Sequence, residues 1–158
     1  MAKEYSTTIA GVIDDFLKSE KWNYMFDEAK GQFVFNFHIT SKIKRIRYIV
    51  DVHKDLYIVY GILPVGGNKD DRSMMTEMSE FLHRVNYGLF NGNFEFDFRD
   101  GEIRYKSFVD CADLIPSRMV VANSLILVKI MYDRYAKGME QILFLDGTAE
   151  EAIHLCEG

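Results

Sequence analysis

The stretch Gln32-Phe33-Val34-Phe35-Asn36-Phe37-His38-Ile39 places an aromatic or aliphatic residue at every second position. Strict alternation over eight residues is typical of a β-strand with one buried face. The aromatic run 22–26 precedes this stretch, and the turn sequence Ala29-Lys30-Gly31 separates the two. Residues 22–39 are therefore predicted to form a β-hairpin.

Two more hairpins follow along the chain. Residues 46–53 alternate again, Lys54-Asp55 forms the turn, and 56–60 forms the return strand. The run 93–98 also alternates and leads into Asp100-Gly101, which predicts a two-residue hairpin turn because glycine tolerates positive φ. Its return strand begins at Ile103.

Four helices are predicted from apolar spacing, over 5–19, 72–87, 116–136 and 149–156. Asp70 or Asp71 is the expected N-cap of the second helix. Pro116 opens the third helix, and Gly138 is its expected stop. The fourth follows the capping-box sequence Thr148-Ala149-Glu150-Glu151.

The element order is α-β-β-β-β-α-β-β-α-α. Strands joined by tight turns favour antiparallel pairing, and segregated helices and hairpins indicate the α+β class. We expect one twisted antiparallel sheet of hairpins with helices packed on it. Residues 1–158 should form a single domain, whose last ~15 residues are a short helical tail.

Composition limits the function classes. The chain has 158 residues, 12 Phe, 9 Tyr and a net charge of −5. So many aromatic residues exclude disorder, and the acidic balance argues against a general nucleic-acid binder.

The ends and the cysteines give an expectation for location. The N-terminus lacks the apolar stretch of a signal peptide, and the most apolar run, 119–132, is too short to span a membrane. Cys111 and Cys156 are the only cysteines, and no CxxC motif is present. We expect reduced thiols in a cytoplasmic protein without membrane contact.

Residues 80–106 carry a dense motif, Glu80-Phe81-Leu82-His83-Arg84-Val85-Asn86-Tyr87, then Gly92-Asn93-Phe94-Glu95-Phe96-Asp97, then Asp100-Gly101-Glu102-Ile103-Arg104-Tyr105. This pattern resembles the YbjN family of small bacterial proteins, whose name speaks of sensory transduction regulation. The tail 146–153 is also similar to the terminal helix of that family. The loop residues Gly88, Phe90 and Asn91 depart from the pattern.

The resemblance implies a fold similar to type III secretion chaperones, with helices on one twisted antiparallel sheet. It implies no catalytic residues. The same motif also has a structural interpretation, since Asn86, Gly92 and Asn93 suit positive or unusual φ around a loop. Glu95, Asp97, Glu102 and Arg104 would meet as charged neighbours across the strands.

Motifs for chemistry are absent. No G-x-S-x-G or P-loop sequence occurs, and His38, His53, His83 and His154 lack the spacing of metal ligands. We therefore expect no enzyme activity, no metal and no cofactor.

A basic segment interrupts the acidic chain. No acidic residue lies between Glu28 and Asp51, and four cations fall at Lys42, Lys44, Arg45 and Arg47. They can protect a solvated sheet edge, meet an acidic protein partner, or bind nucleic acid. The first of these is the structural interpretation.

The third helix has more apolar surface than one interface needs. Besides a broad apolar face, Met119, Ile126 and Ile130 form a second stripe. That stripe must meet the terminal segment, a second subunit or a client protein.

The favoured hypothesis is a non-enzymatic, cytoplasmic protein-binding or regulatory module, chaperone-like, whose partner is another protein or a second copy. Met119, Ile126 and Ile130 would bind the partner, with Lys42, Lys44, Arg45 and Arg47 as an electrostatic rim. The alternative is a small-molecule or anion sensor with a pocket near Trp22, Tyr24 and the basic segment 42–47.

Overall fold

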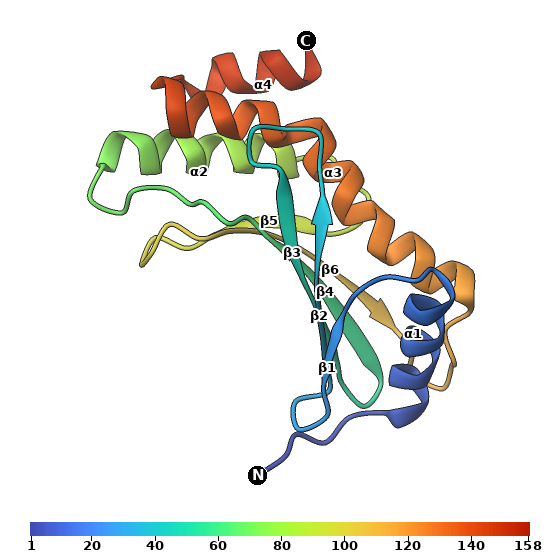
Figure 1. Ribbon diagram of the computed structural model, residues 1–158. Coiled ribbons are helices and arrows are strands. Elements are labelled where there is room, and N and C mark those ends of the chain that lie inside the picture. The colour runs from blue at the N-terminus through green and yellow to red at the C-terminus, as the bar shows by residue number, and fades with distance from the viewer.

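The computed structural model describes residues 1–158, and its element order is the one that the sequence predicts. Ten elements follow one another along the chain (Figure 1): α1 (Thr7–Ser19), β1 (Met25–Asp27), β2 (Gln32–His38), β3 (Arg45–Val52), β4 (Leu56–Ile62), α2 (Arg72–Asn86), β5 (Asn93–Phe96), β6 (Ile103–Asp110), α3 (Arg118–Leu145) and α4 (Ala149–Glu157). The predicted α+β class is confirmed.

All six strands form one antiparallel sheet in the order β1-β2-β3-β4-β6-β5. Strands β1 to β4 are neighbours in sequence and in space. The β5–β6 hairpin joins the sheet through β6, which pairs with β4 after the chain has passed through α2. Its turn contains Gly101 at φ +80°, as the Asp-Gly sequence predicts. The turn is longer than the predicted two residues, because Asp97 N–H donates to Glu102 O and residues 98–101 lie between them.

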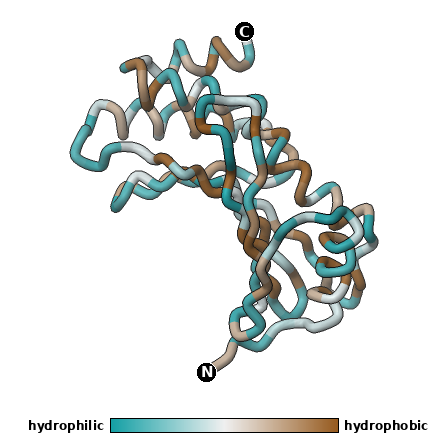
Figure 2. The backbone as a smooth tube through the Cα atoms, viewed as in Figure 1, coloured by the Kyte–Doolittle hydropathy of each residue, from teal (hydrophilic) through white to brown (hydrophobic).

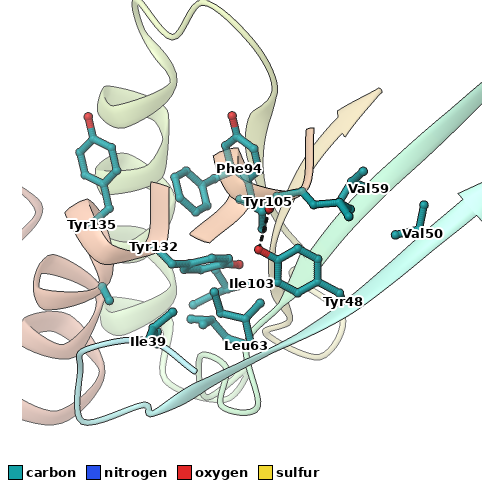
Figure 3. Packing of buried hydrophobic residues seen from close by; sticks show 14 of the residues in the cluster. Ile39, Tyr48, Val50, Val59, Leu63, Phe94, Ile103, Tyr105, Tyr132 and Tyr135 are labelled. Carbon is teal, nitrogen blue, oxygen red and sulfur yellow. Dashed lines mark hydrogen bonds between the residues drawn. The ribbon is translucent and has the colours of Figure 1, made fainter. Parts of the chain in front are cut away.

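The helices lie on one side of the sheet and leave the other side uncovered (Figure 1). Strand residues that point toward the helices are buried in one continuous core. Phe94, Tyr105 and Tyr132 meet there edge to face, with ring centroids 4.9 and 5.3 Å apart (Figure 3). Apolar residues are concentrated in the middle strands and along α3 (Figure 2).

The first hairpin differs from the prediction at its start. Strand β1 begins only at Met25, and the backbone N–H of Trp22 donates to Leu17 O at the end of α1 (3.0 Å). Trp22 instead packs its ring between the helix and the sheet, 5.8 Å from Phe16 and 5.1 Å from Phe37. The partly buried indole thus packs against the core beside β2.

The predicted end of the third helix is wrong. Helix α3 continues through Gly138 to Leu145 and ends at Asp146, which has left-handed backbone (φ 52°). Gly138 is buried where α2 and α4 approach, and a Cβ there would lie 2.5 Å from Phe81 Cζ. Gly138 therefore allows α2 and α4 to pack closely against α3, and it does not end the helix.

The predicted caps of α2 and α4 are confirmed, whereas α3 begins two residues after Pro116, with Ser117 as its N-cap. Asp71 caps α2 by accepting from Met74 N–H (3.0 Å). Thr148 and Glu151 form both bonds of the capping box at α4. These local bonds satisfy N–H groups that a helix start leaves without partners.

Candidate protein-binding surfaces

Helix α3 is held on the sheet by three buried tyrosines. Tyr48 Oη donates to Leu125 O (2.8 Å), Tyr132 Oη donates to Gly61 O (2.7 Å), and Tyr57 Oη pairs with Ser124 Oγ (2.8 Å). Burial raises the pKa of all three hydroxyls, so they remain neutral donors. These bonds connect α3 to strands β3 and β4, in addition to the apolar packing of its buried face.

The outer face of α3 presents the three residues predicted as a second stripe. Met119, Ile126 and Ile130 are 67%, 41% and 50% exposed. We call these three residues the helix stripe. Leu114 and Ile115, immediately before the helix, are also exposed.

The terminal segment does not cover the helix stripe. Helix α4 packs on α2 and on the C-terminal half of α3, where Ala149 and Ala152 are buried. Tyr135 Oη donates to Glu157 Oε1 there (2.6 Å). The sequence left three candidates for the segment that covers the helix stripe: the terminal segment, a second subunit or a client protein. The terminal segment is thus excluded.

The basic segment is divided between two places. The loop between β2 and β3 lies against α3, where Thr40 N–H donates to Asp133 Oδ1 (3.4 Å) and Lys42 N–H to Glu140 Oε1 (2.8 Å). Asp133 lies about one helical turn after Ile130 on α3. Lys42 and Lys44 are exposed residues of this loop, which lies against the part of α3 that follows the helix stripe.

Arg45 and Arg47 lie elsewhere. Both are exposed on β3, at positions that alternate with the buried Ile46 and Tyr48, so they are on the face of the sheet away from α3. Of the four cations, only Lys42 and Lys44 therefore lie in a loop that contacts α3. The expected four-cation rim does not form around it.

The aromatic pocket expected for a sensor is also divided. A shallow groove of about 280 Å³ is lined by Trp22, Asn23 and β2 residues 35–38, and none of these residues is a lysine or arginine. Tyr24 lies outside this groove, with its hydroxyl 2.5 Å from Asp14 Oδ1 on α1. The groove beside Trp22 therefore contains neither Tyr24 nor any residue of the basic segment 42–47.

Sequence reasoning missed the apolar character of the uncovered sheet face. Val34, Ile49, Ile58, Tyr60 and Ile62 are half-buried and point away from the core. The signal was present in β4, which is apolar at every position of Leu56–Ile62 except Gly61. Such a run is typical of a strand that is covered on both faces.

Groups for other chemistry are not assembled. No cluster of three His, Cys, Asp or Glu side chains is arranged to hold a metal ion. Cys111 and Cys156 are both free, and burial raises the pKa of each thiol. No helix is long and apolar enough to cross a membrane.

The motif in residues 80–106 connects the end of α2 to the β5–β6 hairpin. Asn86 at the end of α2 bonds the backbone of Phe94 in β5, and Gly92 has φ +71° in the loop between them. Glu95 forms ion pairs with Arg104 (2.6 Å) and Lys106, as expected for charged neighbours across the strands. Asp97 pairs with Arg99 instead (2.6 Å).

Comparisons with known proteins agree with this fold. No protein-family model and no curated protein matches the chain. The crystal structure of YbjN, a proposed transcription regulator from E. coli, superposes with a TM-score of 0.57 at 7% identity, over 92% of each chain. The HopA1–SchA chaperone–effector complex gives a TM-score of 0.49 at 14% identity, over 80% of this chain and 91% of that one. The likeness to YbjN extends over nearly all of both chains, so this protein has the fold of YbjN, as its sequence motif predicts.

Proposed function

We propose that this protein is a non-enzymatic, cytoplasmic protein-binding module that holds the apolar face of an amphipathic helix on its helix stripe. The observation that carries the proposal is the exposure of Met119, Ile126 and Ile130 on a helix that tyrosine hydrogen bonds hold rigidly on the sheet. An amphipathic helix binds by placing its apolar face on an exposed apolar surface of its partner.

The charge around the helix stripe favours an acidic partner. Lys42 and Lys44 form no ion pair, and Lys137, seven residues after Ile130 on the same face of α3, forms none either. The nearby acids are already occupied, because Asp133 binds Lys129 and Thr40, and Glu140 binds Lys42 N–H. Carboxylates beside the apolar face of a partner helix would therefore meet free cations.

The test compares two exposed apolar residues. Ile126→Glu places a charge in the helix stripe, and Leu155→Glu places the same charge on α4, where Leu155 is also exposed. Both variants should keep the thermal unfolding transition of the wild type, since neither residue is in the core.

The readout is quantitative affinity capture from the native cell. We expect at least one protein to be recovered by the wild type and by Leu155→Glu but lost with Ile126→Glu. Its binding should weaken in Lys42→Ala/Lys44→Ala and with added salt. Recovery of the same proteins by all variants would contradict the proposal.

A further inference from the structure

The uncovered face of the sheet has the composition of an interface. Its centre is the row Val34, Ile49 and Tyr60, which are neighbours across β2, β3 and β4. Ile58 and Ile62 flank Tyr60 along β4. We call these five residues the open face, and none of them belongs to the core or packs against it.

The residues around the open face are ordered by charge. On one side of the central row lies the row Asn36, Arg47, Ile62 and Arg104. On the other side lies the row Gln32, Asp51, Ile58 and Phe108. Arg47 and Arg104 thus lie at one end of the strands and Asp51 at the other, with apolar residues between them. Of these three, only Arg47 forms no ion pair, since Arg104 pairs with Glu95 and Asp51 with Lys3.

This arrangement is complementary to itself. In a symmetric pair, two copies face each other with a two-fold axis between their sheets. The axis runs at right angles to the strands and passes over Ile49 and Tyr60. The axis reverses the strand direction of the second copy, so one flanking row of the first copy meets the opposite flanking row of the second. Arg47 then faces Asp51, Asn36 faces Gln32, and Ile62 faces Ile58 of the second copy.

We propose that the open face is the interface between two copies of this chain. Arg47 is exposed and forms no ion pair within its own chain. Asp51 already pairs with Lys3 of its own chain (2.7 Å), so in the dimer the carboxylate of Asp51 would be shared between that lysine and Arg47 of the second copy. The one cation in the central row, Lys106, pairs with Glu95, which also pairs with Arg104. A closed two-fold dimer uses the same patch on both copies, as this face allows.

The size of the face predicts a weak dimer. Four strands of about seven residues cover a flat area of roughly 450 Å² at ordinary strand spacing and rise. Two such faces lie near the small end of specific interfaces. Facing sheets also pack with their strands about 30° apart, which the twist of the sheet accommodates. We expect association that depends on protein concentration.

The experiment tests the two-fold register directly, by sedimentation velocity over a concentration series. Ile58→Lys and Ile62→Glu each place a charge against an apolar residue of the second copy. The two-fold symmetry repeats this unfavourable contact, so each variant introduces it twice in the dimer. Each should weaken the dimer by at least about a hundredfold. The double variant Ile58→Lys/Ile62→Glu should recover much of the association, because the introduced lysine of one copy then meets the introduced glutamate of the other.

Three results would overturn the proposal. They are a monomer at every concentration, a dimer that survives both single variants, and a double variant that is no better than the singles. Circular dichroism and thermal unfolding establish that each variant is folded. Ile126→Glu in the helix stripe is the matched control and should leave the dimer unchanged, so this test and that of the proposed function fail separately.

Discussion

The side chain of Asn86 at the end of α2 forms two hydrogen bonds with the backbone of Phe94 in β5. Its amide nitrogen donates to Phe94 O (2.9 Å), and its amide oxygen accepts from Phe94 N–H (2.7 Å). Phe94 is buried against Tyr105 and Tyr132, so this pair joins the loop between α2 and β5 to the core.

Asn86→Ala is expected to lower the free energy of unfolding by about 1–3 kcal/mol, because two backbone groups lose their partner. Urea unfolding measures it. Asn93→Ala is the control, since Asn93 makes only one long bond to Phe94 O (3.3 Å). It should cost about 0.5 kcal/mol. Equal costs for the two variants would refute the special role of Asn86.

Gly138→Ala is expected to destabilise the protein although alanine is the better helix former. The new Cβ would lie 2.5 Å from Phe81 Cζ and 2.9 Å from Cys156 Sγ, and Phe81 is fully buried. Overpacking of about 1–3 kcal/mol should exceed the helix-propensity gain of about 1 kcal/mol.

Gly11→Ala is the matched control for that substitution. Gly11 lies in α1, and a Cβ there would meet nothing within 4 Å. The same chemical change should therefore raise the free energy of unfolding by about 0.5–1 kcal/mol. Thermal unfolding of both variants should show shifts of opposite sign, and a stabilised Gly138→Ala would contradict the packing argument.

Acid stability should depend on Asp51. Burial raises the pKa of Asp51, but hydrogen bonds from Lys3 and Gln32 and the charge of Lys3 together lower it by more, so the net pKa is below its ordinary value. As pH falls, the carboxylate of Asp51 is protonated at a higher pH in the unfolded chain than in the folded protein. The stabilisation is therefore present above about pH 4 and is lost as pH falls below it.

Lys3→Met removes the ion pair of 2.7 Å with Asp51. We expect a loss of stability in urea at pH 7 that shrinks at pH 3, where the wild type has begun to lose the same interaction. Lys30→Met is the control, because Lys30 pairs with Asp27 at the exposed hairpin turn and should contribute little at either pH. A Lys3→Met effect that is the same at both pH values would disprove the linkage.

Alkaline unfolding should involve Tyr57. Burial raises the pKa of Tyr57 to about 12. The unfolded chain loses this proton near pH 10, so the stabilisation is present below pH 10 and is lost as pH rises toward 12. The ionisation of Tyr57, obtained as the 295 nm absorbance difference between wild type and Tyr57→Phe, should coincide with the loss of helical circular dichroism. Ionisation well before that loss would show that the hydroxyl is accessible in the folded state.

Local patterns predicted most elements because their causes are local. Alternation in 32–39, the Asp-Gly turn and the Thr148–Glu151 capping box each depend on a few neighbouring residues. The end of α3 was predicted wrongly, since the role of Gly138 depends on Phe81, which is distant in sequence. Trp22 was likewise assigned to a strand, whereas packing against α1 places it beside the sheet.

The candidate surfaces were only partly predictable. Helical spacing identified Met119, Ile126 and Ile130, and their exposure agrees with a second stripe. The four cations of the basic segment follow one another in sequence, but a strand and a loop send them to different faces. A contiguous charge run in sequence is therefore no guide to a contiguous patch.

The sequence by itself determined the order and type of the elements, because the periods of 2 and 3.6 residues and the capping residues act over a few positions. Only the tertiary structure decided which surfaces stay uncovered. The tail packs on α2 and on the C-terminal half of α3 instead of the helix stripe, and all four helices lie on the same side of the sheet. The physical reason is that burial depends on where distant segments pack, and packing is a property of the whole fold.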